Sequence, residues 1–233
     1  MQLPVLLLFD IDGTLLSGAT DAHREALLSA LFTVHGVRAR SFTRPVSPAG
    51  RTDAELARTV LLDAGVSAER IDARAKAVCE ECCRVYARLC PKDLSGTVLP
   101  GVPLVLEWLS GQQHLMLALL TGNFEPVARL KLARAGIGRY FPRGQGAFGS
   151  DSEDRAALPA IARRRAGTPG HPHPRSRTIV IGDTPRDIAC ARADGVRVIA
   201  VACGPFTAGE LSDADAVVEE PSALRDPLVA LGV

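Results

Sequence analysis

The stretch VLLLFDIDGT, residues 5–14, opens with five apolar side chains and closes with two carboxylates, a glycine and a threonine. A short apolar run bounded by turn residues is typical of a strand buried on both faces of a sheet. Gly13 indicates that the chain turns directly after this strand. Because of that turn, Asp10 and Asp12 can both reach one site and take separate roles there.

Two later segments repeat the same arrangement of an apolar run followed by polar residues. Leu115–Leu120 is followed by Thr121-Gly122-Asn123, and Thr178–Ile181 is followed by Gly182 and then by Asp183 and Asp187. Ligands of open parallel sheets bind at the carboxyl ends of the strands. The three polar segments are therefore expected to converge on one site.

The remaining pattern predicts an α/β fold with a Rossmann-like parallel sheet and helices on both faces. Two further strands are predicted at Val196–Val201 and Ala216–Val218. Helical patterns separate the later strands, and they cover Glu125–Ala135, Arg155–Arg165 and Arg186–Ala193.

The interval between the first two strands is too long for a simple crossover. It contains three helical patterns and no strand pattern, at Ala22–His35, Asp53–Ala64 and Ala68–Leu89. We therefore predict an all-helical cap domain inserted into the sheet domain. The predicted boundaries are 17–96 for the cap and 1–16 with 97–233 for the core.

Composition excludes several classes of partner. Of 233 residues, 27 are Lys or Arg and 26 are Asp or Glu, which gives a net charge of +1 and no reason to expect nucleic acid. No apolar run approaches the ~18 residues of a membrane span, and the first run is too short for a signal peptide. The chain is expected to be cytoplasmic, without a membrane partner, and a monomer or a homodimer.

Two features look chemical but are expected to be structural. The six cysteines lack the paired spacing of a zinc site or the density of a disulfide scaffold, so we expect buried or half-buried thiols. Arg163–Arg177 is rich in Pro, Gly and Arg and is expected to be an exposed loop. His171 and His173 in this loop have no carboxylate or cysteine nearby in sequence to complete a metal site.

The strand-end residues suit phosphoryl transfer. Asp10, Asp12, Asp183 and Asp187 would repel one another without a cation, and Mg²⁺ prefers such hard oxygen ligands. Asp10 would be the nucleophile, which splits a difficult hydrolysis into two steps. Asp12 would protonate the leaving oxygen and then deprotonate the attacking water.

Small and polar residues at two of the strand ends suit phosphate binding. Gly13 and Gly122 allow close approach of the backbone to a ligand. The Thr121 hydroxyl and the backbone N–H groups near Asn123 can hold phosphate oxygens.

The segments DIDGT at Asp10–Thr14, TGN at Thr121–Asn123 and GDTPRD at Gly182–Asp187 resemble motifs one, two and four of the haloacid dehalogenase-like hydrolase superfamily. The helical insertion resembles the α-helical cap of its phosphoglycolate phosphatase-like members. The resemblance implies that Asp183 joins Asp10 and the Asp12 backbone carbonyl on Mg²⁺. It also implies that Asp187 supports this metal site, and that Thr121 binds the phosphoryl group.

Motif three departs from the family pattern. The family commonly places a Lys-Pro pair before the helix leading to motif four, whereas this chain has Asp154-Arg155-Ala156. Lys131, on the helix after motif two, is our first choice for the required cation, with Arg155 as a second cation or its replacement. In the cap, Arg51 is a candidate substrate-binding residue, and His23 could approach the site.

The sequence therefore predicts a phosphatase that acts on a small phosphorylated metabolite, with phosphoglycolate as the best-known substrate of similar capped proteins. One alternative is a mutase resembling β-phosphoglucomutase, which uses the same pair of aspartates. Another is a catalytically inactive binding module on the same fold, although intact Asp10, Asp12 and Asp183 argue against it. A dehalogenase is disfavoured because such relatives generally lack an aspartate at the place of Asp12.

Overall fold

A computed structural model describes residues 3–38 and 48–231. At its centre lies one sheet of six strands, all parallel, in the order β3-β2-β1-β4-β5-β6. The strands are β1 (Val5–Phe9), β2 (Leu115–Thr121), β3 (Ala147–Phe148), β4 (Thr178–Gly182), β5 (Arg197–Val201) and β6 (Ala216–Val218). The predicted α/β class with a parallel sheet is confirmed.

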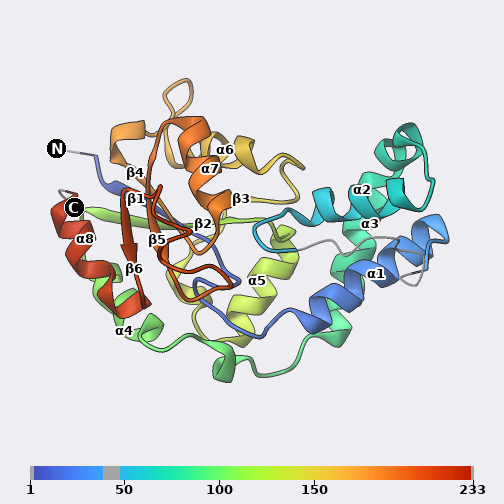
Figure 1. Ribbon diagram of the computed structural model, residues 1–233, viewed down its shortest axis with the longest axis horizontal. Helices are drawn as coiled ribbons and strands as arrows, with labels where there is room; N and C mark the ends of the chain where they lie inside the picture. Colours follow the sequence, from blue (N-terminus) through green and yellow to red (C-terminus); the bar gives the residue numbers. More distant parts are fainter. Residues whose placement is uncertain (1–2, 39–47, 232–233) are drawn as a thin grey trace.

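Helices cover both faces of the sheet (Figure 1). Buried side chains of α4, α5 and α8 belong to one hydrophobic cluster, and those of α6 and α7 belong to the other. The helices of the core are α4 (Val102–Ser110), α5 (Glu125–Arg134), α6 (Leu158–Ala166), α7 (Pro185–Asp194) and α8 (Arg225–Ala230). A single-turn helix, η4 (Arg155–Ala157), precedes α6.

Strand β1 shows why the apolar run fixes the centre of the sheet. Val5, Leu7 and Phe9 pack into one cluster, and Leu6 and Leu8 pack into the other. All five side chains are essentially inaccessible to solvent. Side chains alternate across a strand, so a strand covered on both faces needs apolar residues at every position.

The helical insertion contains α1 (Asp21–His35), α2 (Asp53–Asp63) and α3 (Ala68–Leu89). Gly36 ends α1, and the hydroxyls of Thr52 and Ser67 accept hydrogen bonds from backbone N–H groups in the first turns of α2 and α3. In Figure 1 these three helices form a layer beside the sheet domain.

The two chain crossings between the core and the insertion lie side by side. The Ser17 backbone N–H donates to the Thr97 carbonyl at 2.8 Å, and Leu16 forms a β-bridge with Val98. This pairing supports the predicted boundaries near residues 16 and 97, which remain a prediction.

Apart from single-turn helices, one strand and two helices of the described chain were not predicted. Strand β3 is only two residues long, too short to show a periodic pattern. Helix α4 carries apolar residues on exposed as well as buried positions, including Leu104, which is 78% exposed. Because Pro103 and Leu104 are exposed beside Glu107 and Ser110, the polar face is too narrow to give the usual sequence signature of a surface helix. Helix α8 is a short C-terminal helix with one buried side chain.

The prediction of an exposed loop at Arg163–Arg177 was wrong for residues 163–166, which lie in α6, and for His173, which is buried. Arg163 lies in α6 and is buried, where it donates to both carboxylate oxygens of Asp194 at 2.6 and 2.9 Å and to the His173 carbonyl at 2.7 Å. His173 is 3% exposed. A guanidinium can be buried when its donors find acceptors, and sequence composition does not reveal such acceptors. Residues 168–172 between them are exposed.

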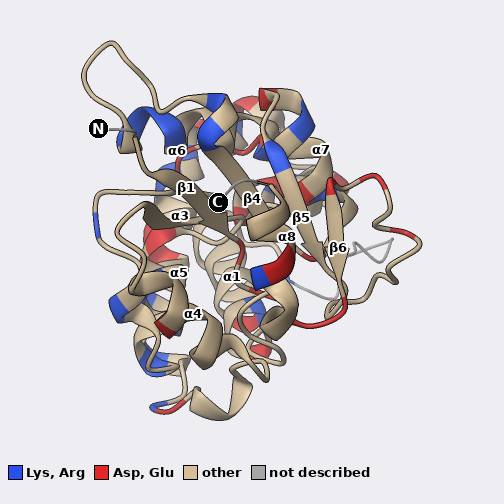
Figure 2. Cartoon of the chain, turned by 90° about the vertical axis from the view of Figure 1, so that its left-hand side faces the viewer, with Lys and Arg blue, Asp and Glu red and all other residues tan. Residues whose placement is uncertain are grey.

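The six cysteines are free thiols, three of them buried and three half-buried, as expected. Among the described helices, none is both long enough and apolar enough to cross a membrane. Figure 2 shows that residues of both charge signs are spread over the chain, in line with its balanced composition.

Candidate active site

The three polar segments meet at the carboxyl edge of the sheet, where they line a cavity of about 520 Å³ between core and cap. The core contributes Asp10, Asp12, Gly13, Thr121, Gly122, Asn123, Arg155 and Asp183 to its wall, and the cap contributes Arg51. Lys131 and Asp187 do not line the cavity. Each of them instead holds a residue that does.

Three carboxylates form the acidic centre of the site. Asp10, Asp183 and Asp187 are buried, and each offers an oxygen within 4.8 Å of the others. Burial raises the pKa of Asp10 to about 6, and the negative charges of Asp187 and Asp12 add to this while Arg155 opposes it. Burial, with the charges of Asp10 and Asp187, raises the pKa of Asp183 to about 8. Such a cluster favours a bound cation.

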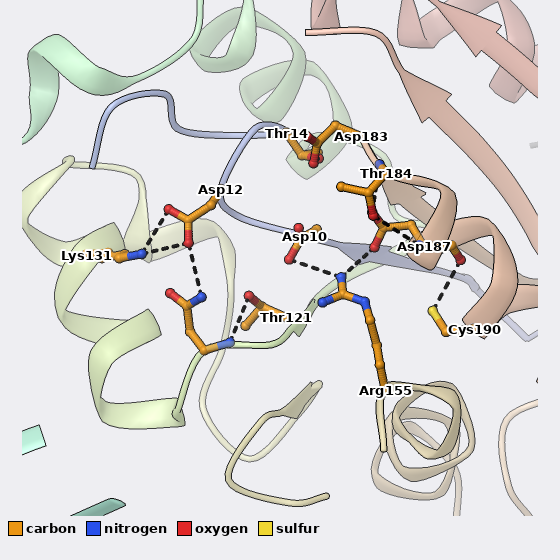
Figure 3. Close-up of polar contacts among 11 residues, drawn as sticks. Asp10, Asp12, Thr14, Thr121, Lys131, Arg155, Asp183, Thr184, Asp187 and Cys190 are labelled. Carbon is orange, nitrogen blue, oxygen red and sulfur yellow. Dashed lines mark hydrogen bonds and ion pairs between the residues drawn. The ribbon is translucent and has the colours of Figure 1, made fainter. Parts of the chain in front are cut away.

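Arg155 is the cation beside this centre. Its Nη2 lies 3.4 Å from Asp10 Oδ1 and donates to Asp187 Oδ1. Figure 3 shows the guanidinium between these two carboxylates. Burial disfavours its charge, but Asp187 and Asp10 outweigh this and raise the pKa of Arg155 well above its usual value. Its Nε is buried without a partner among the described residues.

Asp12 lies on the other side of Asp10 and points to Lys131 (Figure 3). The Lys131 Nζ donates to both carboxylate oxygens of Asp12, at 2.9 and 2.7 Å, and Asn123 Nδ2 donates to Oδ2 at 3.0 Å. Burial opposes ionisation of Asp12, but the charge and hydrogen bonds of Lys131 outweigh it and lower the pKa of Asp12. Lys131 thus pairs with Asp12, whereas Arg155 pairs with Asp10 and Asp187.

Local sequence explains why the acidic residues are held in place. Thr184 and Asp187 form a capping box at the start of α7, in which Asp187 Oδ2 accepts from the Thr184 N–H and hydroxyl at 3.0 and 2.7 Å. Thr14 donates to Asp183 Oδ1 at 3.1 Å. Gly13 has a φ of +92°, and a Cβ there would lie 2.1 Å from Asp183 Oδ2. Only glycine fits at that position.

The backbone of the cap approaches the core closely at Gly122. A Cβ on Gly122 would lie 2.0 Å from the Arg51 carbonyl oxygen, and the Asp53 N–H donates to the Gly122 carbonyl at 2.8 Å. The sequence predicts the approach of a ligand at this glycine, whereas the structure shows the cap segment Arg51–Asp53 packed against it.

His23, weighed as a weaker candidate from the sequence, lines the cavity on the cap side with its Nε2 3.0 Å from Asp53 Oδ2. Other residues on this side were not singled out from the sequence. Arg24, Leu27 and Leu56 also line the cavity. In the sequence, nothing distinguishes these three residues from other residues on the surface of a helix. Cys203 and Gly204, by contrast, follow strand β5, so the rule that ligands bind at strand ends could have identified them.

Comparison with known proteins agrees with this geometry. A family model described as "haloacid dehalogenase-like hydrolase" matches residues 7–192. A phosphoglycolate phosphatase of Pseudomonas fluorescens is 27% identical over 205 residues, which cover 87% of this chain and 71% of the relative. A phosphoglycolate phosphatase of Pseudomonas syringae pv. syringae is 29% identical over 211 residues, with the same two coverages.

Solved structures show the same fold at low sequence identity. A β-phosphoglucomutase of Clostridium difficile superimposes with a TM-score of 0.66 at 16% identity, over 98% of this chain and 96% of that one. A hydrolase from Pseudomonas syringae gives a TM-score of 0.64 at 21% identity, over 97% and 98% of the two chains. The strand-end motifs, the acidic cluster and the family match together show that this chain belongs to the haloacid dehalogenase-like hydrolase family.

Proposed function

We propose that this hydrolase is a magnesium-dependent phosphatase that transfers the phosphoryl group of a small metabolite to Asp10 and then to water. The observation that carries this proposal is the position of Asp10. Its carboxylate lines the cavity beside Arg155 and belongs to the acidic cluster, while Asp12 is held apart from it by Lys131. This separation gives two carboxylates two environments, as a nucleophile and a proton-transfer group require.

Asp10 and Asp183 would hold Mg²⁺, with the Asp12 backbone carbonyl as a further ligand and Asp187 as a supporting residue of the site. Their donor set is all oxygen, and burial together with the neighbouring negative charges raises the pKa values of Asp10 and Asp183, so the residues present fit a hard cation. Asp187 has both oxygens engaged, by Arg155 and by Thr184, so it serves mainly to orient the site. When bound, the ion would neutralise charge on the phosphoryl oxygens.

In the proposed reaction, an Asp10 carboxylate oxygen attacks phosphorus and the P–O bond to the leaving group breaks. Asp12 gives a proton to the leaving oxygen. In the second step, Asp12 takes a proton from the attacking water, and the phosphoryl group leaves Asp10 as inorganic phosphate. Arg155, Thr121 and backbone N–H groups at Gly122 and Asn123 would hold the phosphoryl oxygens.

The cap wall of the cavity would hold the organic part of the substrate. The similarity to phosphoglycolate phosphatases makes phosphoglycolate the first substrate to test, and Arg51 would bind its carboxylate. A β-phosphoglucomutase-like activity remains the second candidate because a protein of that name shares the fold. Formation of an isomer without net release of phosphate would favour the mutase.

The first test is release of inorganic phosphate from p-nitrophenyl phosphate, phosphoglycolate and hexose phosphates, with Mg²⁺ and after treatment with EDTA. We expect turnover with Mg²⁺ and at least about a hundredfold less after chelation, because an uncompensated carboxylate cluster repels a phosphate dianion. Restoration by added Mg²⁺ is the control. Equal turnover in EDTA would contradict the proposed metal role.

Thermal unfolding gives a test of the metal site that does not depend on a substrate. Without metal, the raised pKa values of Asp10 and Asp183 mean that the folded state binds more protons than the unfolded state. The free energy of unfolding of the metal-free protein should therefore fall as pH rises from about 4 to about 8. Mg²⁺ binding must displace these protons, so the increase in Tm caused by Mg²⁺ should be larger at about pH 8 than at about pH 5.5. A pH-independent increase would argue against this cluster as the site.

A further inference from the structure

The start of cap helix α2 rests on the core loop that leads to Arg155. The Thr52 hydroxyl donates to the Glu153 carbonyl at 2.7 Å, and Arg58 Nε donates to Glu153 Oε2 at 2.6 Å. Thr52 is completely buried. Both contacts join the cap to the residue that lies two positions before Arg155.

The start of α2 also forms hydrogen bonds with the loop that follows β2 and contains Thr121–Asn123. The Asp53 N–H donates to the Gly122 carbonyl at 2.8 Å, and Asp53 Oδ2 accepts from the Phe124 N–H at 2.7 Å. The two core loops are themselves joined, since the Gly149 N–H donates to the Asn123 carbonyl at 2.9 Å. The cap thus bridges the loop at Thr121–Asn123 and the loop at Glu153–Arg155.

The loop before Arg155 is held by the core as far as Asp151, which accepts from Arg165 at 2.6 and 2.7 Å. The exposed Asp154 makes only local contacts, since its N–H donates to Ser152 Oγ at 3.1 Å and its side chain accepts from the Ala156 N–H at 2.9 Å. Between them, the Glu153 side chain and carbonyl accept hydrogen bonds from Arg58 and Thr52 of the cap. The hydrogen bonds of the residue two positions before Arg155 are therefore made with the cap.

We propose that Thr52 and Arg58 are positioning residues, which fix Arg155 beside Asp10 through Glu153, so that seating of the cap completes the active site. This inference rests on the proposed phosphatase function. Displacement of a charged group by about 1 Å lowers turnover strongly when that group stabilises the transferring phosphoryl group. Loss of both contacts to Glu153 would leave Asp10 and Asp187 as the charged partners of Arg155 among the described residues.

The test compares Thr52→Val, Thr52→Ser and Arg58→Met by steady-state kinetics on the best phosphomonoester found. We expect kcat to fall about tenfold in Thr52→Val and a few-fold in Arg58→Met, with KM changed less, because Arg155 acts mainly on the transition state. Thr52→Ser keeps the hydroxyl donor and should keep wild-type kcat. Arg84→Met is the matched control for Arg58, because Arg84 is an exposed arginine on α3 paired with Glu81.

A double-mutant cycle with Arg155→Lys separates positioning from a general loss of structure. If Thr52 acts through Arg155, Thr52→Val should lower kcat much less in the Arg155→Lys background than in the wild type. Isothermal titration with inorganic phosphate in the presence of Mg²⁺ gives a second readout, and Thr52→Val should weaken its binding several-fold. Thermal unfolding checks that each variant is folded at the assay temperature.

Additive effects in the cycle, or wild-type kcat and phosphate affinity in Thr52→Val, would overturn this inference. Such a result would leave the phosphatase function intact if wild type still required Mg²⁺ and Asp10. An enzyme whose activity does not depend on Asp10 would instead refute the proposed function itself.

Discussion

Asp10→Asn is expected to lower kcat for phosphate release at least about a thousandfold, since an amide is not a nucleophile at this position and the reaction loses its first step. The substitution keeps the size of the side chain, so the structure of the cavity should persist. It also removes one negative charge from a buried cluster in which the pKa of Asp10 is already raised to about 6. The metal-free variant should therefore unfold at the same temperature as wild type or at a higher one.

Two further variants test whether the loss of turnover is specific to Asp10. Asp63→Asn changes an exposed aspartate at the end of α2 and should retain wild-type turnover. Asp12→Asn should slow hydrolysis of the phosphoenzyme, so that mass spectrometry detects one added phosphoryl group on Asp10 after reaction with a substrate that has a good leaving group. Turnover that survives in Asp10→Asn would remove the basis for the nucleophile assignment.

The strand-end segments could be predicted because they depend on local sequence. Five apolar residues before Asp10, followed directly by turn residues, are typical of a strand covered on both faces, and the turn residues indicate where that strand ends. The carboxyl ends of parallel strands lie at one edge of the sheet, so Asp183 could be placed near Asp10 without knowledge of any contact. The helices of the insertion were predictable for a similar reason, since Thr52 and Ser67 mark their starts.

Contacts between distant segments could not be predicted in this way. Nothing in the sequence says that Lys131 pairs with Asp12 while Arg155 lies beside Asp10. Which cation pairs with which carboxylate depends on the distances of α5 and η4 from the end of β1. Side-chain packing between these elements determines those distances. Burial of Arg163 against Asp194 was missed for the same reason. The role of Lys131 as the cation of motif three remains a prediction, and its geometry favours a role toward Asp12.

That geometry leads to the second large expected effect, which concerns Lys131→Met. The Lys131 side chain is completely buried, and Asp12 is 24% exposed toward the cavity. Removal of the lysine leaves the Asp12 carboxylate with Asn123 as its remaining hydrogen-bond donor among the described side chains. Loss of one partner of a buried ion pair is strongly destabilising, and partial access to water reduces the cost here to about 2–3 kcal/mol. For a chain of this size, that corresponds to a decrease in Tm of about 5–10 °C.

The pH dependence of turnover should change in the same variant. Lys131 holds the pKa of Asp12 below its usual value against the effect of burial, so its removal raises that pKa. Asp12 must be protonated to give a proton to the leaving oxygen and ionised to take one from the attacking water. The limbs of the pH–rate profile that Asp12 sets should therefore both move to higher pH in Lys131→Met.

A double variant tests whether the loss of stability in Lys131→Met comes from breaking the ion pair between Lys131 and Asp12. In Lys131→Met/Asp12→Asn no unpaired charge remains, so most of the lost stability should return although activity does not. Lys76→Met is the matched control, because Lys76 is 90% exposed and its pairing with Glu80 is worth at most about 0.5 kcal/mol. If Lys131→Met were as stable as wild type with an unshifted pH profile, the ammonium would not govern Asp12. The low pKa of Asp12 would then have to come from its neighbours on the cavity side, His23 and Asn123.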